Sequence, residues 1–288
     1  MQSSGRSFLL TLSCPDRVGI VAAVTRELAA HGALITETQH YREPISNRTI
    51  LRVVFEAAAR EPLAMDRFAN DFAAVARQLD MTWRIHDGAQ RLRVLVAVSK
   101  QGHCLNSLLH RWEVGTLPVD ILAVVSNHET QRRLAEWHGL PFHCLPIEAG
   151  RKEEQEEKLL ALFTELNADL LALARYMQIL TEPACRQLAG RAINIHHSFL
   201  PGFKGAKPYH QAHARGVKLI GATAHYVNSD LDEGPIIEQA VERVDHTMTV
   251  EQLTTLGNEI ESVVLNRAIQ WHAEHRIFSF GNRTVVLR

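Results

Sequence analysis

From residue 91 onward, short apolar segments alternate with amphipathic segments, and this alternation limits the possible folds more than any other feature of the chain. The apolar segments predict strands over residues 92–98, 120–126, 142–146, 169–174 and 220–227. Helical spacing between them predicts helices over residues 103–112, 129–138 and 153–167. Parallel strands buried on both faces carry continuous apolar runs, as residues 121–125 do. We therefore predict an α/β fold in which residues 91–288 form a Rossmann-like domain with a mostly parallel sheet.

The first 86 residues follow a different pattern. They predict strands over residues 7–13, 34–42, 49–57 and 81–86, with helices over residues 18–29 and 62–79. On the first helix we expect one buried face, formed by Val18, Val21, Ala22, Thr25, Leu28 and Ala29. The order β-α-β-β-α-β is that of a ferredoxin-like sandwich. Residues 87–90 are polar and contain a glycine, so we expect them to link two domains.

Composition excludes several classes of function. The net charge of −1 gives no broad basic surface for nucleic acid or an anionic membrane. No apolar run reaches the length of about 20 residues that a membrane helix needs, and the N-terminus does not follow the signal-peptide pattern. The four cysteines are widely spaced, without a Cys-x-x-Cys, which disfavours a zinc ribbon or a disulfide framework. We therefore expect a cytoplasmic protein.

The loops that follow the predicted parallel strands are where a ligand is expected, because open α/β sheets bind ligands at the carboxyl ends of their strands. The loop after Val98 contains a single glycine, Gly102. It has neither the Gly-x-Gly-x-x-Gly pattern of dinucleotide-binding domains nor a Walker pattern. A Rossmann oxidoreductase and a nucleoside triphosphatase are therefore poor interpretations.

The loop after Ile195 and a later segment carry groups suited to attack on a carbonyl-type carbon. Asn194 supplies an amide N–H for an oxygen that gains negative charge. His196 supplies an imidazole for hydrogen bonding or proton transfer, and Asp232 supplies a carboxylate that orients the histidine or accepts a proton. These residues are the predicted catalytic group.

The same residues resemble the folate-dependent formyltransferase family, whose catalytic Asn-x-His and more distant Asp match Asn194, His196 and Asp232. Within that family the chain is most similar to the formyltetrahydrofolate deformylases, which join an N-terminal ACT domain to this catalytic domain. The resemblance covers nearly the whole chain. Its motifs are Ile193–Pro201, Gly205–Ala212 and Gly221–Val227.

The resemblance implies hydrolysis of 10-formyltetrahydrofolate to tetrahydrofolate and formate, which supplies formate for purine biosynthesis and balances the one-carbon folate pool. It implies no prosthetic group and no metal, since the folate is the substrate. It assigns folate binding to Met177, Gln178, Ile179, Leu180, Asn228, Ser229, Asp230 and Leu231. We expect His197 to support its neighbour His196.

The resemblance of residues 1–86 to an ACT domain rests on Cys14–Ile20, after the first strand. In such domains a free amino acid often binds near this turn, and a helix N-terminus offers unpaired N–H groups to a carboxylate. The predicted effector site is formed by Asp16, Arg17, Val18 and Gly19. A turn that only docks the module is an equally good interpretation. Pairing of ACT domains implies a homo-oligomer, a dimer or a tetramer.

Two alternative functions remain at this stage. The first is a formyltransferase with an amine acceptor, which uses the same catalytic residues. Against it, the residues from Lys100 to Asn106 lack most of the Gly- and Ser-rich phosphate cradle that the nucleotide formyltransferases have in this loop, so water is the expected acceptor. The second is a regulatory amino-acid-binding protein with an inactive catalytic domain, which the presence of all three catalytic residues disfavours.

Overall fold

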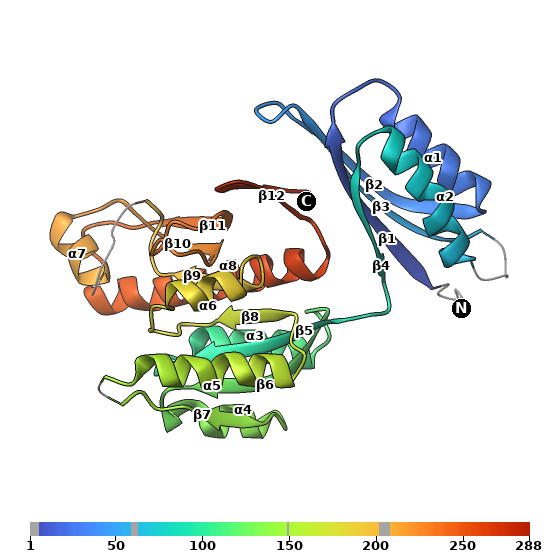
Figure 1. Ribbon diagram of the computed structural model, residues 1–288. Coiled ribbons are helices and arrows are strands. Elements are labelled where there is room, and N and C mark those ends of the chain that lie inside the picture. The colour runs from blue at the N-terminus through green and yellow to red at the C-terminus, as the bar shows by residue number, and fades with distance from the viewer. Residues whose placement is uncertain (1–5, 59–62, 149, 202–207) are drawn as a thin grey trace. The chain divides into compact units, whose positions relative to one another are not determined.

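The computed structural model describes residues 6–58, 63–148, 150–201 and 208–288 (Figure 1). The chain divides into two compact units. Unit 1 comprises Met1–Arg91 together with Val286–Arg288, and unit 2 comprises Leu92–Val285. The last three residues therefore belong with the N-terminal unit, whereas the sequence analysis assigned them to the C-terminal domain.

Unit 1 is a four-stranded antiparallel sheet with strand order β2-β3-β1-β4. Both helices cover one face of this sheet (Figure 1). The strand order and the alternation of elements confirm the predicted ferredoxin-like fold. Its elements are β1 (Ser7–Pro15), α1 (Ile20–Ala30), β2 (Ala33–Glu43), β3 (Arg48–Ala57), α2 (Met65–Gln78) and β4 (Thr82–Asp87). Of the predicted second helix, residue 62 lies outside the described residues.

The buried face of α1 differs from the predicted one. The core receives Ile20, Val24 and Leu28, whereas Val18 is fully exposed and Val21 is 37% exposed. The helix carries two apolar stripes, and the one with three large aliphatic residues at i, i+4 and i+8 removes more apolar surface from water than one made partly of Ala and Thr. Among the residues of the predicted face, only Leu28 is fully buried.

Unit 2 contains a seven-stranded sheet with order β11-β10-β9-β8-β5-β6-β7. The pairs among β9, β8, β5, β6 and β7 are parallel, and β10 runs antiparallel to both of its neighbours. The predicted mostly parallel sheet is confirmed. Its strands are β5 (Leu92–Val98), β6 (Val119–Ser126), β7 (Phe142–Cys144), β8 (Leu170–Leu173), β9 (Ala192–His196), β10 (Leu219–Tyr226) and β11 (Ile236–Arg243).

Helices cover both faces of this sheet. One core contains side chains of α3 and α8 against β5, β8 and β9, and the other contains side chains of α5 against the opposite face. The helices are α3 (His103–Glu113), η1 (Glu129–Gln131), α4 (Arg132–Trp137), α5 (Lys152–Glu165), α6 (Glu182–Gln187), α7 (Pro208–Arg215) and α8 (Val250–Ala273). A short two-stranded sheet of β12 (Ile277–Phe280) and β13 (Arg283–Val286) follows.

The C-terminal part of unit 2 contains elements that the sequence analysis did not assign. The most important is α8, which begins at a capping box: Thr249 accepts from the backbone N–H of Gln252, and the Gln252 side chain accepts from the backbone N–H of Thr249. This helix lies across the sheet beside β9, β10 and β11. Within the described ranges, no helix combines the length and apolarity needed to cross a membrane.

The end of α8 supplies a prediction about stability. The Tyr226 hydroxyl lies 2.6 Å from Nδ1 of His272, and burial lowers the pKa of His272 from 6.5 to about 4. Between pH 6.5 and pH 4 this histidine is protonated in the unfolded chain but stays neutral in the folded protein. The free energy of unfolding therefore falls as the pH decreases from 6.5 toward 4. A shift of this size corresponds to a loss of about 1–2 kcal/mol between pH 7 and pH 5.

Urea denaturation at the two pH values measures this loss. The matched variant is His272→Gln, whose amide oxygen can accept from Tyr226 but does not titrate in this range. We expect the pH-dependent loss to be smaller in the variant than in the wild type by that amount. Equal losses in the two proteins would show that His272 is not responsible.

Candidate active site

A cavity of about 580 Å³ lies at the carboxyl edge of the unit 2 sheet, and its walls come from the loops after β5, β8, β9 and β10 and from α7 and α8. All the predicted catalytic and folate-binding residues line it, together with His197. Further lining residues are Gln101, Leu173, Arg175, Tyr176, Cys185, Ile195, Tyr209, His210, His225, Val227, Thr254 and Asn258. The position agrees with the rule that ligands of open α/β sheets bind beyond the carboxyl ends of the strands.

Strand β9 places two of the predicted catalytic side chains on the same face. Successive side chains of a strand point to opposite faces, so Asn194 and His196 share one face while Ile193 and Ile195 share the other. The two isoleucines are buried in the core beneath α3 and α8. Their burial sets the register of β9, because a shift by one residue would move Asn194 and His196 into that core.

The third predicted catalytic side chain comes from the connection between β10 and β11. Nδ1 of His196 lies 3.2 Å from Oδ1 of Asp232. Asp232 has a left-handed backbone with φ of 58°, a conformation that Asp tolerates better than most residues. A Cβ atom at Gly234 would lie 1.7 Å from the carbonyl oxygen of Tyr226, so the connection can pass this close only with glycine at that position.

Electrostatics keep Asp232 ionised. Burial would raise the pKa of this carboxyl, but the neighbouring imidazoles of His196 and His225 outweigh burial and hold the pKa well below its usual value. The carboxylate therefore accepts the Nδ1–H of His196. Among the described residues, Nε2 of His196 has no hydrogen-bond partner although it is buried. This nitrogen is free to interact with a substrate or a water molecule.

His225 contacts the predicted catalytic residues, a role that the sequence analysis did not assign to it. It stands opposite Asn194 in the β9–β10 ladder, and its Nε2 lies 3.3 Å from the Asn194 amide nitrogen and 3.7 Å from Oδ1 of Asp232. Its Nδ1 lies 2.9 Å from the carbonyl of Tyr226, to which it donates. Nε2 therefore faces both the Asn194 amide and the Asp232 carboxylate, and His225 orients these two groups. The alternation of side chains between the two faces of a strand, applied to the Gly221–Val227 motif, is the sequence signal that could have indicated this position of His225.

The predicted folate-binding segments give the cavity an apolar wall. Met177, Ile179 and Leu231 line it and each leaves more than half of its surface exposed. Large apolar side chains exposed within a concave site favour a flat, partly apolar ligand. The segment after β8 is held by Ser99, whose hydroxyl accepts from the backbone N–H of Met177 at 3.0 Å.

Behind the cavity lies a buried polar cluster centred on Glu261 of α8. Its carboxylate accepts from Nε2 of His103 at 2.8 Å and from the Tyr209 hydroxyl at 2.7 Å, and Nε of Arg175 lies 3.3 Å away. Burial would raise the pKa of Glu261, but the hydrogen bond from His103, the charge of Arg175 and the bond from Tyr209 lower it. Glu261 is therefore a fully buried carboxylate with three partners.

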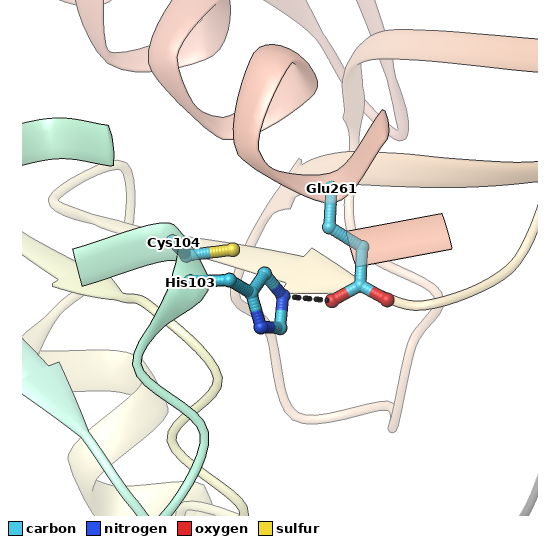
Figure 2. A group of neighbouring side chains, drawn as sticks. All are labelled: His103, Cys104 and Glu261. Atoms are coloured by element: carbon cyan, nitrogen blue, oxygen red, sulfur yellow. Dashed lines mark hydrogen bonds and ion pairs between the residues drawn. The ribbon is translucent and has the colours of Figure 1, made fainter. Parts of the chain in front are cut away.

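His103, Cys104 and Glu261 are close enough to one another to offer three metal ligands (Figure 2). The chemistry of the cluster does not favour a cation. The guanidinium of Arg175 already neutralises Glu261, and a divalent ion at the same oxygen would be repelled by it. Burial also raises the pKa of the Cys104 thiol, so the sulfur stays protonated and is a poor ligand.

His197 lies between this cluster and the catalytic pair. Its ring stacks on that of His196, with centroids 4.8 Å apart and an interplanar angle of 20°. Nη1 of Arg175 lies 2.6 Å from Nδ1 of His197, and because a guanidinium can only donate, this nitrogen accepts. The ring is therefore neutral. The supporting role of His197 stays a prediction.

One predicted motif lies partly outside the described residues, and the predicted effector site lies outside unit 2. Of the motif Gly205–Ala212, residues 205–207 lie outside the described residues. The predicted effector residues lie in unit 1, before α1, where Asp16 pairs with Arg42 at 2.7 Å and accepts from the Thr49 hydroxyl at 2.5 Å. Gly19 takes the left-handed conformation with φ of 93°.

Comparison with known proteins agrees with this geometry. Residues 92–269 match the formyl transferase family. The chain is 49% identical to a formyltetrahydrofolate deformylase of Corynebacterium sp. (strain P-1), over 97% of this chain and 98% of that protein. The chain belongs to the formyltetrahydrofolate deformylase family. A crystal structure of a formyltetrahydrofolate deformylase from Burkholderia mallei shares the fold with a TM-score of 0.93 and 52% identity, over 98% of this chain and 100% of that chain.

A second group of solved structures matches this chain over a smaller part. Glycinamide ribonucleotide transformylase 1 from Symbiobacterium toebii is 30% identical to it, with a TM-score of 0.66. The match covers 70% of this chain and 96% of that chain. The fold that carries Asn194, His196 and Asp232 is thus shared with a transferase, while the deformylase family matches the chain over nearly its full length.

The close approach at Gly234 gives a test of how the site is built. We expect Gly234→Ala to displace the connection that carries Asp232 and to destabilise the folded protein by about 2 kcal/mol or more, as steric conflict with backbone commonly does. Thermal unfolding measures the effect. Ser229→Ala, an exposed position in the same connection, is the control and should leave the melting temperature nearly unchanged. Equal melting temperatures for Gly234→Ala and the wild type would show that the backbone has room there.

Proposed function

We propose that this protein hydrolyses 10-formyltetrahydrofolate to tetrahydrofolate and formate. The observation that carries the proposal is the 3.2 Å contact between His196 and Asp232, beside Asn194, in a cavity of a chain that belongs to the formyltetrahydrofolate deformylase family. An ionised carboxylate, an oriented imidazole and an amide donor are the groups that hydrolysis of a formamide needs. No prosthetic group is part of the proposal.

The folate binds with its pterin ring against Met177–Leu180 on one side and Asn228–Leu231 on the other. The exposed apolar side chains of these segments supply the walls, and backbone groups at Gln178 and Leu180 would bind the edge of the ring. The formyl group then reaches His196 at the end of β9. Flat, partly apolar walls with a few polar groups are suited to a pterin.

His196 is the proton acceptor in this mechanism. The low pKa of Asp232 makes that carboxylate a weak base, so it serves to hold Nδ1–H of His196 and to stabilise the imidazolium. Nε2, which lacks a partner among the described residues, takes a proton from water as the water oxygen bonds to the formyl carbon. Asn194 donates an N–H to the resulting oxyanion.

Collapse of the tetrahedral intermediate breaks the bond between the formyl carbon and N10. The imidazolium of His196 returns its proton to N10 as the amine leaves. The products are tetrahydrofolate and formic acid, which loses a proton to solvent at neutral pH. One water molecule is consumed in each turnover, and no other reactant is required.

For unit 1 we propose the role of an ACT regulatory domain, comprising residues 1–86, joined by residues 87–90 to a catalytic domain of residues 91–288. A free amino acid would bind at Asp16, Arg17, Val18 and Gly19. The ordered turn before α1 supports this site, because Thr49 and Arg42 fix Asp16 there. A homo-oligomer, dimer or tetramer, would follow from pairing of this domain.

Formate release from 10-formyltetrahydrofolate, with no amine added, tests the proposed function. We expect multiple turnovers with the wild type. Asp232→Asn should reduce turnover by about 10²–10⁴-fold with the fold intact, because the histidine loses the partner that orients it and stabilises its charge. Glu233→Gln removes the neighbouring exposed carboxylate and is the matched control, with nearly normal turnover expected.

The outcomes separate the candidate functions. Tight folate binding without formate release would reject hydrolysis. Formation of tetrahydrofolate and a formylated amine only when an amine is added would favour a formyltransferase. Normal turnover in Asp232→Asn would leave the deformylase activity standing but reject the role of Asp232. Circular dichroism of each variant shows whether it is folded.

A further inference from the structure

The cavity has two sides, which correspond to the two faces of the unit 2 sheet. Tyr176, Leu180 and Val227, which border the folate-binding segments, pack into the core that contains α5. The opposite wall includes Arg175 and Tyr209, whose partner Glu261 comes from α8 on the other face. A formyl group held at His196 by a folate on the first side would meet its acceptor on the second side.

Arg175 occupies that second side. The residue is only 8% exposed, although it lines the cavity and carries a full charge. Its guanidinium donates to Oε1 of Gln101 from Nε at 2.9 Å and from Nη2 at 2.5 Å, and to Nδ1 of His197 from Nη1 at 2.6 Å. With Glu261 3.3 Å from Nε, all three guanidinium nitrogens are engaged. These contacts fix the position of the guanidinium group.

The backbone at this position is also unusual. Arg175 has φ of 64°, in the left-handed region that costs a residue with a Cβ about 1–2 kcal/mol. Arg175 lies two residues after the end of β8 and follows the buried residue Ala174. Strain of this kind persists only where surrounding contacts over-determine the conformation. Here Gln101, His197 and Glu261 supply those contacts.

The start of α3 offers no place for an anionic acceptor either. The His103 side chain, at the first residue of the helix, points to Glu261 (Figure 2). A Cβ at Gly102 would lie 2.4 Å from Oε1 of Gln131, whose amide donates to the carbonyl of Lys100 at 2.7 Å. The Gln131 side chain therefore covers Gly102, and a phosphate or carboxylate at this helix start would approach the buried carboxylate of Glu261.

We propose that Arg175, locked by Gln101, His197 and Glu261, closes the acceptor side of the cavity and restricts the formyl acceptor to water. This inference rests on the proposed hydrolysis and names the residues that set its specificity. The catalytic residues alone do not choose between water and an amine, because both attack the same carbon. The choice then depends on the space beside His196.

Hydroxylamine is a suitable probe because it is a small amine nucleophile whose product can be distinguished from formate. Its nitrogen bonds to the formyl carbon, the bond from that carbon to N10 breaks, and N10 takes the proton that the amine loses. The products are formohydroxamate and tetrahydrofolate. At a fixed hydroxylamine concentration, the ratio of formohydroxamate to formate, corrected for the reaction without enzyme, measures the choice of acceptor.

The decisive variant is Arg175→Gly, which opens the acceptor side and places at this position the residue that adopts a φ of 64° without strain. We expect the product ratio to rise by about tenfold or more, the scale on which a change in pocket space alters discrimination. The matched control is Asn167→Gly. Asn167 is an exposed residue after α5 that also has a left-handed backbone, with φ of 47°. Its replacement by glycine relieves the same kind of backbone strain and should leave the product ratio unchanged.

An unchanged ratio in folded Arg175→Gly would overturn the proposal, as would an equal rise in Asn167→Gly. If Arg175→Gly does not fold, Gln101→Ala provides the test, since it removes the acceptor of two guanidinium N–H groups from an exposed loop position. A smaller rise in the same direction is expected there, and no rise would reject the proposal. Failure of the wild type to release formate would instead reject the proposed function.

Discussion

The pair formed by His196 and Asp232 is the interaction on which the arrangement of unit 2 depends most. The histidine ends a central strand of the sheet, and the aspartate comes from the connection after an antiparallel strand. Bringing them to 3.2 Å requires the turn back from β10 to β11, which passes the carbonyl of Tyr226 so closely that position 234 admits only glycine. A largely parallel sheet therefore has an antiparallel turn beside the predicted catalytic pair.

A second constraint is the burial of charge behind the site. Glu261 is fully buried, and a carboxylate in such a place is stable only with several partners. His103, Tyr209 and Arg175 supply them from three different segments of the chain. Arg175 then links this cluster to the ring that stacks on His196. Replacing one member of such a cluster leaves the others unsatisfied, so its shape is specified more sharply than an apolar core would be.

Much of this could be predicted from the sequence because the signals are local. Two residues apart on a strand, Asn194 and His196 had to share a face, and buried apolar runs indicated the parallel sheet. The buried face of α1 was predicted wrongly, since its two apolar stripes differ only in the size of their side chains. The pairing of Arg175 with Glu261 joins residues distant in the chain, and a lone Glu in a long helix gives no signal of burial. His225 was visible as a residue, but its contact with Asn194 depends on strand register.

The central claim is that His196 and Asp232 act as one unit on the attacking water. A double-mutant cycle of formate release tests it, with His196→Asn, Asp232→Asn and the double variant assayed beside the wild type. When two residues act as a unit, replacing either one already removes most of their joint contribution to the rate. The turnover of the double variant should therefore lie within about threefold of that of the slower single variant. Losses that multiply in the double variant would show two independent contributions and would contradict the account.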